Sequence, residues 1–146
     1  MSPMIRLGLA VASVAIVVMG LTGAGPGPAH GEPSTIVRVE LTEYALTPAR
    51  VTLQVGKPIT LKVVNRGRMT HMVASPYLAS RDLEVEGGEM EVDAPNGIKY
   101  VKLRPGKSAE IKFTPEARGT FDMECDMTHA GRLHRELGMK GEVVVE

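Results

Sequence analysis

Hydrophobic and polar residues alternate with a period of two along most of the chain after residue 34. This alternation is typical of strands with one buried face and one solvated face. Gly, Pro and Asn interrupt it at intervals of about ten residues, as in proteins built from short strands and tight turns. The pattern predicts strands over Ile36–Leu41, Arg50–Val55, Ile59–Val64, Ile98–Leu103, Ser108–Thr114, Thr120–Met123 and Gly141–Val145. The sequence therefore predicts an all-β sandwich.

The segment Tyr77–Asn96 departs from this pattern because it is strongly acidic. It holds six acidic residues between Asp82 and Asp93 and no basic residue after Arg81. We predict a solvated loop or a short helix here, since runs of like charge usually lie in solvent. An acidic surface that docks a basic partner is the alternative.

The N-terminal segment has the pattern of an export signal. Arg6 precedes an uncharged run of 15 residues, Leu7–Leu21, and a stretch rich in Gly and Pro follows. A basic start, a short apolar core and small residues after it are typical of a secretory signal peptide. We predict that residues 1–31 are signal peptide and linker, with cleavage placing the mature start between Gly25 and Glu32. This makes the protein periplasmic or secreted. An uncleaved anchor is the alternative, and membrane contact is expected only in that case.

Composition excludes several classes of function. Lys plus Arg and Asp plus Glu are each 17, so the formal net charge is zero, which argues against a nucleic-acid partner. Aromatic residues make up only 3% of the chain, which disfavours a surface for stacking bases. The chain has neither a motif of paired catalytic carboxylates nor one of a nucleophile beside a base, so we expect no enzyme. One cysteine, Cys125, excludes an intramolecular disulfide.

Soft metal donors gather between the last two predicted strands. The segment from Phe121 to Gly141 contains Cys125, His129, His134 and Met139. A further histidine, His71, follows the third predicted strand, and Met69 and Met72 flank it. Thiolate, imidazole and thioether donors suit copper better than calcium or magnesium. The sequence therefore predicts a copper site.

At these residues the chain resembles the cupredoxin family of small copper proteins. Asn65 lies six positions before His71, and Gly119-Thr120-Phe121 leads toward Cys125. The ending His134-x4-Met139-Lys140-Gly141 then enters the closing strand. The resemblance covers residues 35–146. It implies a Greek-key β-sandwich with one copper held by His71, Cys125, His134 and a weak axial Met139. It also implies a one-electron carrier that acts with redox partner proteins.

The spacing in the ligand loop leaves the fourth ligand open. Eight residues separate Cys125 from His134, whereas three separate Cys125 from His129. The short spacing resembles that of nitrosocyanin, a red-copper relative, and makes His129 a candidate ligand. The ending of the loop favours Met139. We expect both His129 and His134 to lie within reach of the metal.

Two other functions remain possible at this stage. One is a copper storage or delivery protein that meets copper-handling proteins through the methionines near the site. The other is a structural sandwich without metal. Redox cycling at a fixed ligand set distinguishes the electron carrier from the storage protein. Absence of copper from the protein would favour the structural sandwich.

Overall fold

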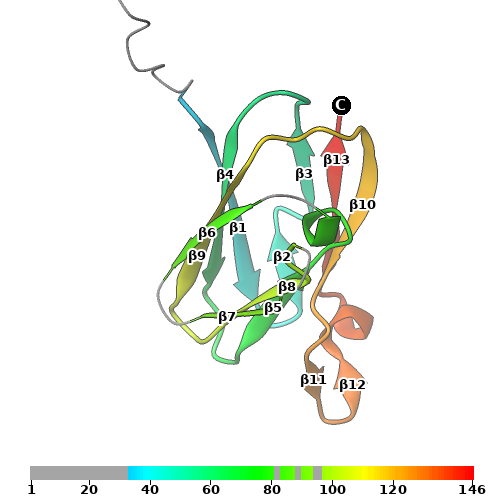
Figure 1. Ribbon diagram of the computed structural model, residues 1–146. Coiled ribbons are helices and arrows are strands. Elements are labelled where there is room, and N and C mark those ends of the chain that lie inside the picture. The colour runs from blue at the N-terminus through cyan, green and yellow to red at the C-terminus, as the bar shows by residue number, and fades with distance from the viewer. Residues whose placement is uncertain (1–32, 81–82, 88–89, 94–96) are drawn as a thin grey trace, which may run out of the picture. The chain divides into compact units, whose positions relative to one another are not determined.

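Two sheets face each other (Figure 1), and alternating apolar side chains from both sheets form a shared core between them. The structure, a computed structural model, describes residues 33–80, 83–87, 90–93 and 97–146. Strands β8 (Tyr100–Leu103) and β9 (Ser108–Phe113) illustrate the alternation, since every second residue in each is buried. The core takes residues from both sheets, including Val39, Leu41, Leu61, Val63, Val73, Val101, Ile111, Met123, Val143 and Val145.

One sheet has five strands in the order β2-β1-β4-β9-β6. Their bounds are β2 Ala45–Thr47, β1 Thr35–Thr42, β4 Ile59–Asn65, β9 Ser108–Phe113 and β6 Glu84–Gly87. Strands β1 and β4 are parallel, and the other neighbours are antiparallel. The sheet is therefore mixed.

The second sheet has six strands in the order β3-β13-β10-β5-β8-β7. Their bounds are β3 Arg50–Leu53, β13 Lys140–Val145, β10 Gly119–Glu124, β5 His71–Ala74, β8 Tyr100–Leu103 and β7 Met90–Asp93. The last strand in the chain, β13, lies between β3 and β10 and pairs with β3 in parallel. Two 3-10 helices, η1 Leu78–Ser80 and η2 His134–Leu137, and the hairpin β11 Thr128–His129 with β12 Arg132–Leu133 complete the elements.

The predicted all-β sandwich is confirmed, and each of the seven predicted strands is present with small shifts at its ends. The predicted leader and linker, residues 1–31, lie outside the described residues. Within the described ranges, no helix is long and apolar enough to cross a membrane.

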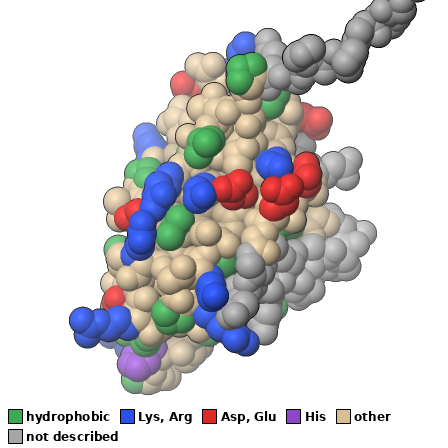
Figure 2. Space-filling view, turned by 90° about the vertical axis from the view of Figure 1, so that its left-hand side faces the viewer, with side chains coloured by type: hydrophobic (Ala, Val, Ile, Leu, Met, Phe, Trp, Pro, Cys, Tyr) green, Lys and Arg blue, Asp and Glu red, His purple; other side chains and the backbone are tan. Residues whose placement is uncertain are grey.

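The prediction of a loop or short helix over Tyr77–Asn96 was wrong for the residues of β6 and β7, and residues 81–82, 88–89 and 94–96 lie outside the described ranges. This segment contains η1 and two strands, β6 and β7, which are the outer strands of their sheets. The acidic residues Glu84 and Glu86 lie 3.8 Å and 2.9 Å from the ammonium group of Lys112 on the neighbouring β9. Figure 2 shows acidic and basic side chains interspersed on the face that it views. The neighbouring Lys112 thus lets Glu84 and Glu86 lie on an edge strand, and it balances part of the charge that an acidic docking surface would use.

Candidate metal centre

Three adjacent strands of the six-stranded sheet deliver the predicted donors to one end of the sandwich. His71 is the first residue of β5, and Cys125 directly follows β10. His134 begins η2, and Met139 directly precedes β13. Strand β10 lies between β13 and β5, so the donors at the ends of these strands meet.

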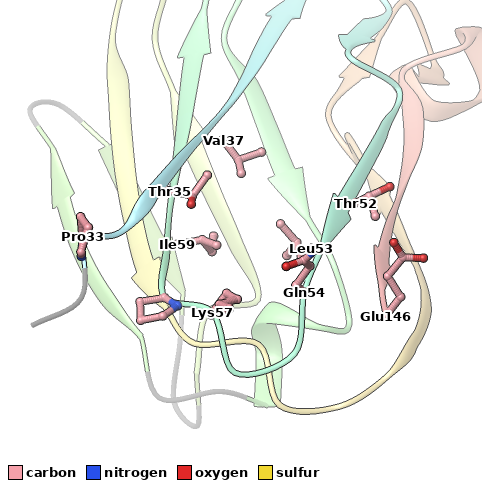
Figure 3. Close-up of a pocket in the computed structure, with 10 residues that line it drawn as sticks. Pro33, Thr35, Val37, Thr52, Leu53, Gln54, Lys57, Ile59 and Glu146 are labelled. Carbon is pink, nitrogen blue, oxygen red and sulfur yellow. The ribbon is translucent and has the colours of Figure 1, made fainter.

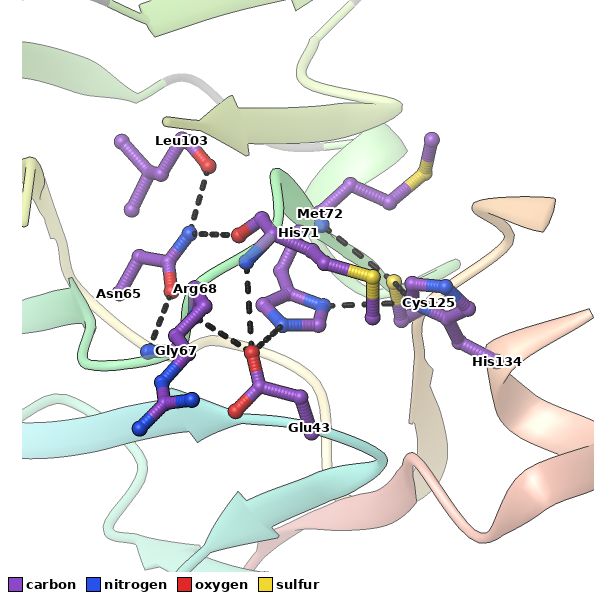
Figure 4. A network of polar contacts seen from close by, with 10 residues as sticks. Glu43, Asn65, Gly67, Arg68, His71, Met72, Leu103, Cys125 and His134 are labelled. Atoms are coloured by element: carbon purple, nitrogen blue, oxygen red, sulfur yellow. Dashed lines mark hydrogen bonds and ion pairs between the residues drawn. The ribbon is translucent and has the colours of Figure 1, made fainter. Parts of the chain in front are cut away.

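His71, Cys125 and His134 form a buried donor group, with ligand atoms all within 4.8 Å of one another. The Nδ1 atoms of the two histidines are 3.2 Å apart, and Cys125 Sγ is 3.5 Å from His134 Nδ1 (Figure 4). The exposed fraction is 0% for His71 and Cys125 and 2% for His134. Atoms that share one metal ion at about 2.0–2.3 Å lie about 3–4 Å from one another, so these separations suit a common ion.

The polar atoms of this group also fit a metal. Two imidazole nitrogens face each other and a thiol sulfur, and a cation between them can bind all three lone pairs. The Nε2 atoms of His71 and His134 are buried without a hydrogen-bond partner in the described part of the chain. Two imidazoles and one thiol form the soft and borderline donor set that copper prefers.

Burial sets the protonation of the donor group. Desolvation, and then the nearby charge of His134, lowers the pKa of His71 below its usual range. Desolvation also lowers the pKa of His134, whereas it raises the pKa of the Cys125 thiol. At neutral pH the imidazoles therefore offer free lone pairs, and the thiol holds a proton that a metal must displace.

The side chain of Asn65, at the end of β4, shapes the turn before His71. Its Nδ2 donates hydrogen bonds of 2.8 Å to the carbonyl oxygens of Met69 and Leu103. Its Oδ1 accepts a hydrogen bond of 2.8 Å from the amide of Gly67 (Figure 4). Asn65 is fully buried, so this network ties the turn that carries His71 to strand β8.

The long loop after Cys125 folds outward as the hairpin β11–β12, which projects from the sandwich at this end (Figure 1). At its base, the amide of His134 donates to the carbonyl of Met127 at 2.8 Å. The amide of Arg135 donates to the carbonyl of Cys125 at 3.0 Å. The residues between Cys125 and His134 thus leave the sheet and return, and the two donors come together despite their distance in sequence.

The two candidates for a fourth ligand, His129 and Met139, differ in burial. His129 is exposed on β11 and is outside the donor group, so of the two loop histidines only His134 is brought into it. Met139 is fully buried, and its amide donates to the carbonyl of His134 at 2.9 Å. Its carbonyl accepts a hydrogen bond of 3.1 Å from the amide of Cys125. Met139 is therefore tied to two members of the donor group through the backbone.

Sequence reasoning missed two residues that contact the donor group, Glu43 and Tyr44. Glu43 Oε1 lies 3.8 Å from His71 Nε2, and the Tyr44 ring packs edge-on against the His134 ring with centroids 5.1 Å apart. Both lie in the turn between β1 and β2, far from the predicted ligands in sequence. A glutamate and a tyrosine in a turn carry no metal-ligand signal, so only the fold reveals them.

A hollow lies at the end of the sandwich opposite the donor group, where β1 and β4 begin (Figure 3). It has a volume of about 520 Å³, and its lining includes Thr35, Val37, Leu53, Ile59 and Glu146. This lining contains no histidine, cysteine or methionine. The donor chemistry of the described residues is therefore concentrated at the end that holds Cys125.

Comparisons with known proteins agree with this architecture. The family model of the cupredoxin-like domain matches residues 11–145. No curated protein matches the chain. Among solved structures, reduced auracyanin from the photosynthetic bacterium Roseiflexus castenholzii is 26% identical, with a TM-score of 0.54 over 77% of this chain and 98% of that one.

Two further structures share the fold at lower identity. Auracyanin B is 21% identical, with a TM-score of 0.54 over 78% of this chain and 90% of that chain. A multicopper oxidase from Campylobacter jejuni is 12% identical, with a TM-score of 0.53 over 78% of this chain and 30% of that chain. The sandwich thus resembles a whole auracyanin but only one part of the oxidase.

Proposed function

Since the chain belongs to the cupredoxin-like domain family, we propose that it is an exported mononuclear copper protein that carries single electrons between redox partner proteins. The observation that carries this proposal is the buried donor group of His71, Cys125 and His134. Copper bound there supplies one-electron chemistry by alternating between Cu(I) and Cu(II). The similarity to reduced auracyanin supports a redox role.

The protein supplies a fixed and dry set of donors. His71 and His134 each direct Nδ1 into the site, and Cys125 directs its sulfur toward them. The amide of Met72 donates to Cys125 Sγ at 3.4 Å, which stabilises negative charge on the sulfur. A thiolate and two imidazoles with a weak axial donor is the ligand set of blue-copper electron-transfer sites.

We propose that the thioether of Met139 would be the fourth, weak donor to copper. Its burial and its backbone bonds to Cys125 and His134 support this assignment over one to the exposed His129. Copper held by Cys125, His71, His134 and Met139 would give a thiolate-to-Cu(II) charge-transfer band, so the protein would be blue in its Cu(II) form.

The similarity to oxidases does not extend to a proposed catalytic activity. The Campylobacter jejuni oxidase and a copper-containing nitrite reductase from Thermus scotoductus are matched over only 30% and 31% of their lengths. At 12% identity these matches report the fold alone. An electron carrier needs one copper and a surface for its partners, and the single donor group of the described residues meets the first need.

Reconstitution with copper tests the function directly. The wild-type protein should bind one copper per chain, show a thiolate-to-Cu(II) charge-transfer band and cycle reversibly in voltammetry. Cys125→Ser should abolish that band, whereas His129→Ala, which removes an exposed histidine outside the donor group, should keep it. An unchanged band in Cys125→Ser would show that the site is wrong. Copper that binds but does not cycle would favour storage or delivery over electron transfer.

A further inference from the structure

The turn between β1 and β2 contacts both histidines of the donor group. Thr42 pairs with Ala45 across this hairpin, so the turn consists of Glu43 and Tyr44 alone. Glu43 Oε1 lies 3.8 Å from Nε2 of the buried His71. The ring of Tyr44 packs against His134 with an interplanar angle of 82°. Two consecutive residues thus contact two imidazoles that are 63 positions apart in sequence.

The backbone at Tyr44 is unusual for an aromatic residue. Its φ angle of 62° lies in the left-handed region, which bulky side chains rarely adopt and which costs conformational free energy. Glycine adopts the same angle without strain. The contribution that tyrosine makes and glycine cannot is therefore its ring, which packs edge-on against His134. The turn also packs near η2, since a Cβ at Gly138 would lie 3.3 Å from the Tyr44 carbonyl oxygen.

The carboxylate of Glu43 is held in place by backbone donors and by the absence of a side chain at Gly67. The amides of Arg68 and Met69 donate to Glu43 Oε1 (Figure 4). A Cβ at Gly67 would lie 2.7 Å from Glu43 Oε1 and 2.8 Å from His71 Nε2. Such an atom would force the carboxylate and the ring apart, so glycine at this position permits their approach.

We propose that Glu43 and Tyr44 are positioning residues for the metal, which hold the outer sides of His71 and His134 so that both Nδ1 atoms stay directed at Cys125. This inference rests on the proposed copper site. A carboxylate beside Nε2 favours the tautomer with its proton on Nε2, which leaves the Nδ1 lone pair for a metal. The Tyr44 ring packs against His134, whose buried Nε2 has no hydrogen-bond partner among the described residues, so the ring would keep water from this imidazole.

Substitution of Tyr44 separates positioning from a merely structural role. If the residue only shapes the turn, Tyr44→Gly should relieve the backbone strain and leave the copper spectrum unchanged. Our proposal predicts that Tyr44→Gly shifts the Cu(II) charge-transfer band, admits azide to the metal and weakens copper binding by about tenfold or more. Tyr44→Phe keeps the ring and should restore wild-type behaviour.

The outcomes of the Tyr44 experiment are distinct. Tyr44→Asn is a second variant without the ring, and asparagine tolerates the left-handed region, so it serves if Tyr44→Gly does not fold. A ringless variant with the wild-type band and no azide binding would overturn the role of Tyr44. Equal changes in Tyr44→Phe and Tyr44→Gly would also overturn it. If the wild-type protein shows no copper band, the proposed function fails instead.

The reduction potential tests the role of Glu43. A negative charge beside a copper ligand stabilises Cu(II) over Cu(I), so Glu43→Gln should raise the potential. Glu40→Gln is the matched control, because it removes the same charge on β1 from a carboxylate that pairs with Arg38 and Arg66. Gly67→Ala should also raise the potential by moving the carboxylate from the ring. Equal potentials in wild type and Glu43→Gln, or equal shifts in Glu43→Gln and Glu40→Gln, would overturn the role of Glu43.

Discussion

The buried thiol of Cys125 determines how copper binding depends on pH. Burial raises the pKa of this thiol, so the metal-free protein holds the proton at neutral pH. Burial lowers the pKa of His71 and His134, so the imidazoles are already unprotonated there. Copper binding at pH 7 should therefore release about one proton. Calorimetry in two buffers with different ionisation enthalpies measures this number.

The sign of the pH dependence follows from the same groups. Affinity should rise with pH up to the raised pKa of Cys125, because a proton no longer has to be displaced above it. Below the lowered pKa values of His71 and His134 the imidazoles also take up protons, so more protons should be released per copper. Proton release near zero at pH 7 would contradict a protonated Cys125 in the free protein.

The choice between Met139 and His129 can be made by single substitutions. Met139→Leu preserves an apolar side chain of similar volume but removes the sulfur donor. Loss of a weak axial donor disfavours Cu(II) more than Cu(I), so the reduction potential should rise. His129→Ala should change neither the potential nor the spectrum, because His129 is exposed on the hairpin. A shift in His129→Ala alone would assign the fourth position to His129.

Three members of the donor set could be recognised from sequence because their chemistry is rare in this chain. Cys125 is the only cysteine, and His71 and His134 are two of four histidines. The short spacing after Cys125 favoured His129 as a ligand, because spacing predicts a ligand only if the chain runs directly from the strand to it. The intervening residues instead form the β11–β12 hairpin. Contacts between distant segments, such as that of Tyr44 with His134, cannot be predicted from the spacing of residues along the chain.

At the scale of elements, apolar alternation predicted strands such as β8 and β9 and missed others such as β5 and β6. Strand β5 has only four residues and begins with a buried histidine, so its pattern is not apolar alternation. Strand β6 carries exposed acidic residues, and this sequence pattern is also typical of a solvated loop. Its partner β9 supplies the lysine that makes this charge tolerable, and pairing between distant segments is invisible to a local pattern.

The approach of β13 to the segment before β3 should depend on Gly141. A Cβ there would lie 2.2 Å from the carbonyl oxygen of Ala49, which accepts a 2.8 Å hydrogen bond from the amide of Glu142. We expect Gly141→Ala to lower the free energy of unfolding by about 2–3 kcal/mol, because the strand must move. Denaturant titration measures the loss.

Gly106→Ala is the control for that substitution. Gly106 has a φ angle of 76° and open space where a Cβ would lie. Its substitution should cost about 1 kcal/mol through backbone strain alone. Equal losses in the two variants would show that the contact with Ala49 does not limit the packing of β13.

At the scale of the whole molecule, the N-terminal pattern predicts where the protein acquires copper. The apolar run Leu7–Leu21 predicts export, and the protein is therefore expected to acquire copper outside the cytoplasm. N-terminal sequencing of the protein from its native host should find a start between Gly25 and Glu32. Recovery of an intact Leu7–Leu21 segment in the membrane fraction would favour an anchored domain instead.

The central place of β13 has a consequence for biosynthesis. It is the last strand of the domain that the ribosome makes, yet it lies between β3 and β10 in the finished sheet. A growing chain that lacks it leaves the edges of β3 and β10 unpaired and cannot fix Met139, which directly precedes it. The proposed copper site therefore cannot be complete before β13 is made. Its metal would be loaded onto a chain whose six-stranded sheet has closed around β13.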